Sequence, residues 1–261
     1  MLRLLNIEWK KLWPYRAFRL LFAAFFLLLV LSLLIGRSLK GDGNEEINDL
    51  FRILDLPNIW NYYLFIATIL NIVLGIIVIF VVTNEFSYKT IRQNLIDSMT
   101  RGEIYISKLF LVLILTTLST VVVFLSGIAA GFIYNPGSDL AAVLERSTMT
   151  GGYFVACLGT LSLALLIGVL LKRSGLATIL FILFIFPIDV ILNQGVLKGC
   201  CEEYMPVSVL FTGLINFPTK MIQSFGEEAQ TKIELMPLLV GFGYIILFNI
   251  GTYMLINRRD L

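Results

Sequence analysis

The sequence predicts an all-α integral membrane protein with six transmembrane helices. Hydrophobic residues make up 58% of the 261 residues and charged residues only 15%, and the mean hydropathy of +0.88 is far above that of a soluble domain. Apolar runs that are long enough to cross a hydrocarbon core of about 30 Å recur along the chain. The six expected spans are Phe18–Gly36, Trp60–Val82, Leu109–Tyr134, Gly152–Leu171, Leu176–Asn193 and Leu235–Ile256.

The distribution of lysine and arginine predicts which side of the membrane the connecting segments face. An even number of spans puts both termini on the same side. If that side is the cytoplasm, thirteen of the 20 lysine and arginine residues lie inside and seven outside. This is the bias that the positive-inside rule describes. We therefore expect cytoplasmic termini, and the small net charge of +2 gives no reason to expect a nucleic-acid partner.

The first sixteen residues, Met1–Arg16, predict an amphipathic helix that lies along the inner leaflet. At helical spacing, Trp9 and Trp13 share one face with three leucines, whereas Lys10 and Lys11 lie off that face. Tryptophan rings at headgroup depth and lysines toward water are typical of such an interfacial helix. An ordinary basic flank of the first span is the alternative, and the periodicity favours the helix.

A polar segment, Thr83–Leu109, connects the second and third spans and is too long and too regularly patterned for a simple turn. On a helix, Phe86, Ile91, Leu95 and Ile96 lean to one side. The polar residues that lean elsewhere are Lys89, Arg92, Gln93 and Asp97. We therefore expect a short amphipathic helix at the cytoplasmic ends of two spans, with its outer face available to a partner.

The same segment predicts where this short helix stops and the next one starts. Gly102 suits a C-cap, because glycine tolerates the left-handed conformation that often ends a helix. Glu103 is then expected in the first turn of the next helix, where the helix dipole favours an acid.

Polar side chains within the spans are candidates for a substrate path. Asn71 is either a buried, hydrogen-bonded amide or a substrate contact, and the hydroxyls of the third span serve either helix packing or transport. Asp189 lies near the outer end of the fifth span, where it is either a cap or part of a transport route. The Gly127–Gly131 spacing predicts that the third span packs closely against another helix. The candidate path residues are Asn71, Thr116, Thr117, Thr120 and Asp189.

The long outer segment Gln194–Glu234 contains a mildly apolar stretch, Tyr204–Phe217, that is too short to span a membrane and too apolar for a simple loop. We expect a re-entrant or interfacial helical segment there. Cys200 and Cys201 are adjacent and Cys157 lies within a span, so three cysteines give no disulfide framework. The role of Cys200 and Cys201 stays open.

The residue inventory argues against catalysis in this chain. The sequence has no histidine, which excludes histidine-based metal sites, Ser-His or Cys-His nucleophile pairs and HExxH proteases. It has no GxxxxGK[ST] phosphate-binding loop and no charge pair in the middle of a span. We expect no catalytic residue, cofactor or metal in this chain, and expect any energy source to be a partner.

The polar segment Thr83–Leu109 resembles a segment of a known protein family. Asn84–Leu95, Ser98–Glu103 and Lys108-Leu109 resemble the cytoplasmic segment of ATP-binding-cassette (ABC) transporter permeases of the type-2 export family. The likeness extends over the whole chain, since those proteins also have an amphipathic N-terminal helix, six spans and a re-entrant hairpin between spans five and six.

In that family a glutamate–aromatic pair closes the second span, and Glu85-Phe86 stands at that place. A Thr-Ile/Leu-Arg run opens the coupling helix that docks on the ATPase subunit, and Thr90-Ile91-Arg92 matches it. The family often has glycine where Lys89 stands. The docking residues that the resemblance implies are Ile91, Leu95 and Ile96 as buried anchors, together with Glu85, Phe86, Lys89, Thr90, Arg92 and Arg101. Glu85 is further expected to pair with a basic residue of the N-terminal helix.

The resemblance implies one permease domain, residues 1–261, in the bacterial cytoplasmic (inner) membrane. Its parts are the interfacial helix 1–16, spans one to five in 17–193, the outer segment 194–234, and span six with the cytoplasmic tail in 235–261. The implied partners are two copies of a cytoplasmic ABC ATPase, which would bind ATP and magnesium, a second permease copy or similar chain, and membrane lipids. The implied function is export driven by ATP hydrolysis.

Other interpretations stay open. The chain is alternatively a membrane anchor or assembly subunit of a secretion, envelope or motility machine that uses an ABC-like fold. An ion-driven carrier or membrane enzyme is disfavoured by the missing histidines and charge pairs. The polar segment is alternatively a loop that contacts only lipid headgroups, but its mixed charges favour a protein partner. Nothing in the sequence selects a substrate, or a homodimer over a heterodimer.

Overall fold

The computed structural model describes residues 16–40, 56, 58–96, 99–188, 204–215 and 233–258. Nearly all of these residues are helical and none of them forms a strand, which confirms the predicted all-α class. The predicted interfacial helix, with Trp9, Lys10, Lys11 and Trp13, lies outside the described residues, as do Asp189, Cys200 and Cys201.

Four helical stretches are long and apolar enough to cross a membrane. Three of them are the helices α4, α6 and α13, and the fourth, Leu140–Leu171, ends in α8. Their bounds are α4 Ile59–Ser87, α6 Arg101–Tyr134, α8 Thr150–Leu171 and α13 Leu235–Arg258. Two further helices carry shorter apolar stretches, α2 (Arg16–Lys40) and α9 (Ser174–Leu183). Thus four of the six predicted spans have the length and composition of a membrane-crossing helix.

Short helices connect or follow these long ones. The α-helical pieces are α5 (Thr90–Ile96), α7 (Leu140–Leu144) and α11 (Pro206–Ser208). A 3-10 turn, η2 (Ser147–Met149), precedes α8, and π-helical turns form η3 (Phe184–Ile188) and η6 (Val209–Gly213).

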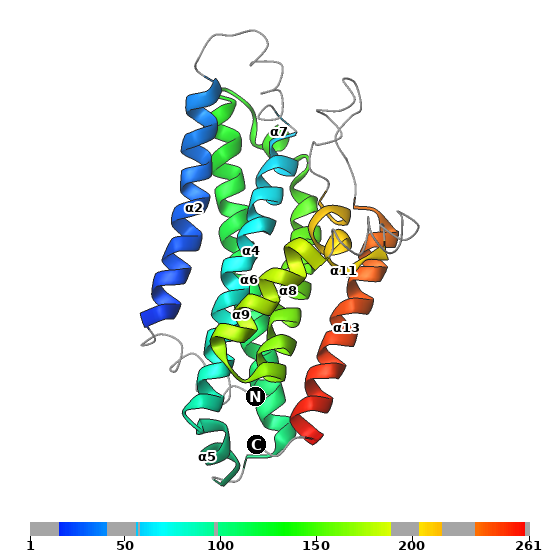
Figure 1. The fold of residues 1–261 in the computed structure, drawn as a ribbon. Helices are drawn as coiled ribbons and strands as arrows, with labels where there is room; N and C mark the ends of the chain where they lie inside the picture. Colours follow the sequence, from blue (N-terminus) through cyan, green and yellow to red (C-terminus); the bar gives the residue numbers. More distant parts are fainter. Residues whose placement is uncertain are drawn as a thin grey trace.

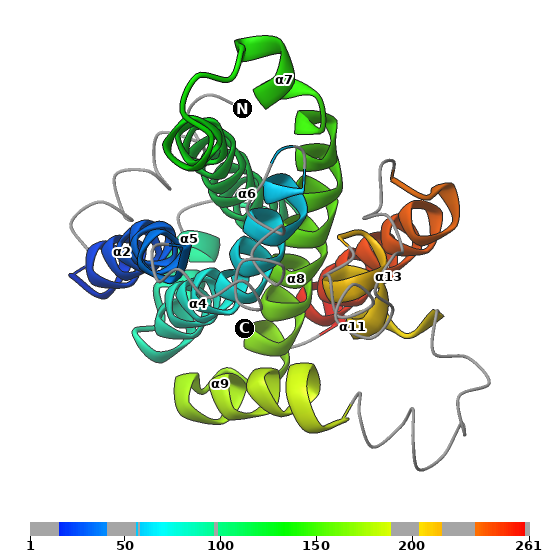
Figure 2. The same ribbon diagram turned by 90° about the horizontal axis from the view of Figure 1, so that it is seen from above.

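Helix α8 is the centre of the bundle (Figures 1 and 2). It contacts α4, α6, α9 and α13, while α2 packs on the outer side of α4. Within their apolar windows, 72% of the residues of the stretch that ends in α8 are buried, against 28% for α13. The hydrophobic core therefore forms around α8, and α13 is a peripheral helix.

The helix directions bring the predicted cytoplasmic segments together at one end of the bundle (Figure 1). This end holds α5, the Lys172–Arg173 turn between α8 and α9, and the last turn of α13 at Arg258. Helix α7 lies at the opposite end. The described segments that the lysine and arginine bias assigns to one side are therefore neighbours in space.

The two glycines of the third predicted span make the close contacts that their spacing predicts. A β-carbon at Gly127 would come within 2.7 Å of the Trp60 indole, and one at Gly131 within 2.7 Å of Val143. The Trp60 Nε1 in turn donates a hydrogen bond to the Val143 carbonyl oxygen at 2.6 Å. Gly127 thus lets α6 approach α4, with an indole ring filling the space between them.

The described part of the outer segment is helical and packs into the bundle. Leu210 lies against Gly159 of α8, where a β-carbon would come within 2.5 Å of it. Leu210 and Leu214 are buried, and η6 contacts both α8 and α13. The apolar character of this stretch is therefore explained by burial against two helices.

Candidate functional site

A tight turn at Tyr88 and Lys89 joins the end of α4 to α5. Lys89 has φ +55°, in the left-handed region that favours glycine because a β-carbon is strained there. Its carbonyl oxygen accepts a hydrogen bond from the Gln93 N–H, so the strained residue also starts α5. This conformation gives a physical reason why the resembling permeases often have glycine at this position.

We expect Lys89→Gly to stabilise the protein by about 1 kcal/mol, because it removes the left-handed strain at a cost in chain entropy that is smaller. Gln93→Gly, a matched change inside the exposed face of α5, should destabilise because glycine in a helix interior is unfavourable. Chemical or detergent unfolding of the purified variants measures both effects. An equal loss of stability in the two variants would contradict the assigned strain.

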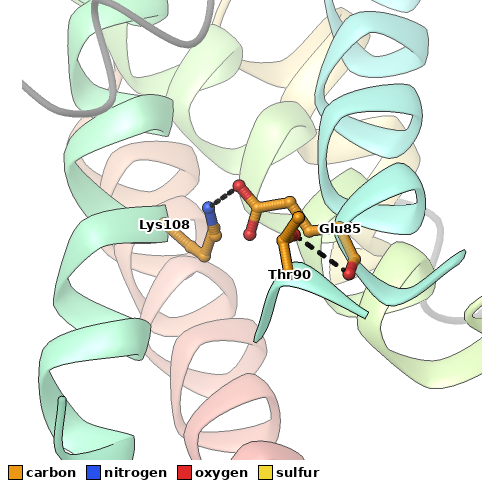
Figure 3. Close-up of polar contacts among 3 residues, drawn as sticks. All are labelled: Glu85, Thr90 and Lys108. Atoms are coloured by element: carbon orange, nitrogen blue, oxygen red, sulfur yellow. Dashed lines mark hydrogen bonds and ion pairs between the residues drawn. The ribbon is translucent and has the colours of Figure 1, made fainter. Parts of the chain in front are cut away.

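A buried ion pair holds the two long helices together beside this turn (Figure 3). The Lys108 Nζ of α6 lies 2.6 Å from Glu85 Oε1 of α4, and both residues are buried. The Thr90 hydroxyl donates to the Glu85 backbone carbonyl oxygen at 3.2 Å. Glu85 thus connects α4 to α6 through its carboxylate and to α5 through its carbonyl group.

Helix α5 is anchored to the bundle by Ile91. Its side chain is only 4% exposed and lines a small cavity. The other lining residues are Val82 and Phe86 of α4, Ile104 and Lys108 of α6, Val169 of α8, and Ile256 of α13. Helix α5 packs mainly against α4, and residues of α6, α8 and α13 line the same cavity as Ile91.

The turn between α8 and α9 also contacts this site. The Lys172 Nζ lies 5.1 Å from the centroid of the Phe86 ring, within the range of a cation–π interaction. Lys172 ends α8 in a left-handed conformation, and its N–H donates to the Gly168 carbonyl oxygen. The end of α4 therefore has a charged neighbour from α8.

Arg101, the first residue of α6, contacts the last turn of α13. Its guanidinium donates hydrogen bonds to the carbonyl oxygens of Ile256 and Asn257. Cations stabilise the C-terminal ends of helices because the carbonyl groups there are unpaired and carry partial negative charge. One turn further along α6, the Tyr105 hydroxyl donates to Asn249 Oδ1 at 3.3 Å.

Helix α6 begins with a capping box, which is not among the features predicted above. The Glu103 N–H donates to the Thr100 hydroxyl oxygen, while the Glu103 carboxylate accepts from the Thr100 N–H. Glu103 lies in the first turn, as predicted. The C-cap assigned to Gly102 is wrong, because Gly102 is the second residue of α6 and α5 already ends at Ile96.

The outer face of α5 and its preceding turn are exposed to solvent. Tyr88 is 76% and Ile96 78% exposed, and Lys89 and Gln93 are exposed beside them. Two large apolar side chains therefore lie uncovered at the end of the bundle that carries the basic connecting segments. Exposed apolar side chains on α5 and on the turn before it are suited to covering by a protein partner.

The structure divides the predicted docking residues into two groups. Lys89 and Ile96 are exposed, whereas Glu85 and Ile91 are buried within the chain. Phe86, Thr90, Leu95 and Arg101 are half-buried, and the Arg92 side chain lies outside the described atoms. Glu85 pairs with Lys108, while its expected partner on the N-terminal helix lies outside the described residues.

Comparison with known proteins gives a family for the chain. A family model described as "Protein of unknown function (DUF2705)" matches residues 24–261. The chain belongs to this family. A search of curated proteins finds no match to it.

In this DUF2705 chain four of the five candidate path residues lie in the described part of the chain. Asn71 and Thr116 are buried in the core. Thr117 is exposed and donates to the Leu113 carbonyl oxygen, and Thr120 donates to the Thr116 carbonyl oxygen of its own helix. These bonds are the packing role that polar residues of apolar helices commonly have.

Proposed function

We propose that this chain is the permease subunit of an ATP-driven ABC exporter and that α5 is the helix that docks on a cytoplasmic ATPase subunit. The observation that carries the proposal is the combination of a buried anchor and an exposed apolar face on one short helix. Ile91 is buried beside a cavity that four long helices line, while Ile96 at the end of α5 and Tyr88 in the turn before it are exposed. The resemblance of the surrounding residues to the coupling segment of type-2 export permeases supports the same assignment.

We further propose the complete membrane arrangement that accompanies this function. Helices α2 and α9 would be the first and fifth of six spans, with α5 and both termini in the cytoplasm and the outer segment re-entrant near η6. Two permease chains would pair with two ATPase subunits in the bacterial cytoplasmic membrane. The ATPase subunits would bind ATP and magnesium, and this chain would bind neither.

Physical coupling from α5 to the spans follows from the contacts at the site. A displacement of α5 would pull on α4 through Ile91 and on α6 through the Glu85–Lys108 pair. The Lys172 contact with Phe86 would carry it to α8, and the Arg101 hydrogen bonds to α13. Rigid attachment at several helices is what a transmitting element needs, since a loosely held helix would move without moving the bundle.

The proposal is tested by co-purification of the tagged chain from its native membrane, comparing Ile96→Glu with wild type. We expect an ATPase, identified by mass spectrometry and by its phosphate-binding loop, to accompany wild type. A glutamate at the centre of an apolar contact should weaken binding by at least tenfold, because a charge would be buried without a partner.

The matched control is Leu140→Glu, which places the same charge on a residue that is 57% exposed at the opposite end of the bundle. This variant should retain the ATPase. If wild type carries no ATPase, the exporter assignment is wrong and a membrane anchor or assembly subunit takes its place. If Leu140→Glu and Ile96→Glu lose the ATPase equally, α5 is not the docking helix.

A further inference from the structure

A line of polar side chains runs through the otherwise apolar interface between α4, α6 and α8, and we call it the polar seam. Its members are Asn71 of α4, Thr116 and Ser119 of α6, and Tyr153 and Cys157 of α8. All five side chains are completely buried. Polar groups are costly to bury, so each one needs a hydrogen-bond partner.

Tyr153 is the node of the seam. Its hydroxyl donates to Asn71 Oδ1 at 2.7 Å, and the same oxygen lies 2.6 Å from Ser119 Oγ. A phenol has one proton, and here that proton is committed to Asn71. Ser119 must therefore donate to the Tyr153 oxygen, so the hydrogen bonds run in one direction, from α6 to α8 to α4.

Two hydrogen-bond donors beside this chain of hydrogen bonds have no partner among the described residues. The two donors, Asn71 Nδ2 and Thr116 Oγ1, are buried side-chain atoms. The Cys157 thiol lies beside Thr116, and a thiol is a weak acceptor. Asn71 is bonded to Tyr153, and Thr116 lies three residues before Ser119, the other partner of Tyr153, on the same face of α6. The two unpartnered donors thus flank the Tyr153 node.

We propose that the polar seam is an internal water-binding site between α4, α6 and α8. Water is the ligand that fits, because it accepts from the Asn71 amide and the Thr116 hydroxyl and can donate to the free lone pairs of Ser119 and Asn71. None of the five side chains of the seam is charged at neutral pH, which disfavours an ion. The assignment does not depend on the proposed transport function.

X-ray radiolytic labelling of the intact protein tests the proposal, because hydroxyl radicals formed from bound water modify adjacent side chains that bulk solvent does not reach. We expect Tyr153 and Cys157 to be labelled in wild type. Phe181, which is equally buried but packs against Gly75 of α4, is the dry control and should stay unmodified after correction for intrinsic reactivity. Labelling of Tyr153 and Cys157 no greater than that of Phe181 would overturn the proposal.

The substitution Thr116→Val gives an independent test, because the Tm should change differently when the seam binds water and when it does not. Thr116→Val removes an unpartnered hydroxyl with little change of shape, so in a dry seam it should leave the Tm unchanged or raise it. If water is bound, the substitution removes one of its partners, and we expect the Tm to fall by a few degrees and Cys157 labelling to decrease.

The matched control is Thr252→Val, on a threonine that is equally buried in α13 and bonds only its own helix through the Phe248 carbonyl oxygen. A Tm of Thr116→Val that is equal to or above that of Thr252→Val would overturn the proposal. If Thr116→Val does not fold, wild-type labelling decides the question alone.

Discussion

Lys108→Met is expected to lower the free energy of unfolding by about 3–5 kcal/mol, because it leaves the Glu85 carboxylate buried without its countercharge. The Lys108 Nζ and Glu85 Oε1 atoms are 2.6 Å apart, and only 3% of the Lys108 side chain and 11% of the Glu85 side chain are exposed. Water therefore cannot replace the missing charge. Methionine keeps the length and most of the apolar stem of lysine. Unfolding titrations in mixed detergent measure the loss.

The double variant Glu85→Met/Lys108→Met separates the ion pair from packing. Replacing both members of a buried pair with apolar residues is often neutral or stabilising, since the desolvation cost of both charges disappears. We therefore expect the double variant to regain most of the stability that Lys108→Met loses. A double variant as unstable as the single one would show that the shape of Lys108, and not its charge, holds α4 and α6 together.

Gly127→Ala is the second substitution for which we expect a large effect, a loss of about 1–3 kcal/mol from overpacking. The added β-carbon would lie 2.7 Å from the Trp60 ring. The ring cannot move away freely, because Trp60 Nε1 is hydrogen-bonded to the Val143 carbonyl oxygen. Relief of the clash therefore breaks that bond or separates α6 from α4.

Gly243→Ala is the control, on a glycine of α13 with open space around its missing β-carbon. Alanine has the higher helix propensity, so this variant should be neutral or more stable than wild type. Thermal unfolding of the two variants in the same detergent gives the comparison. Equal stability of the two alanine variants would contradict the close contact between Gly127 and Trp60.

The features that the sequence predicts well depend on composition over many residues. The long apolar runs predict α4, α6, α8 and α13, since about 20 apolar residues leave few alternatives to a membrane-crossing helix. Apolar spacing likewise predicts a short helix after Thr83, and α5 lies there. The basic bias predicts which connections are neighbours, and they lie at one end of the bundle.

The candidate site was predicted less completely, because its key contacts join residues that are distant in the sequence. Lys108 is 23 residues from Glu85, and nothing local distinguishes it from other lysines that flank a span. Which side of α5 faces the bundle also depends on the turn at Lys89, so the sequence pattern could not separate Ile91, which is buried, from Ile96, which is exposed. The Thr100–Glu103 capping box, by contrast, was visible in the sequence as Thr-x-x-Glu.

Site-specific photo-crosslinking from position 96 tests most directly whether α5 is a docking helix. A photoreactive amino acid replaces Ile96 in cells, and the same residue at position 140 marks the opposite end of the bundle. We predict a crosslink from position 96, and none from position 140, to a soluble protein that contains a phosphate-binding loop and hydrolyses ATP. Crosslinks from position 96 only to lipid, or to the same proteins as position 140, would contradict the assignment of α5 as the ATPase-docking helix.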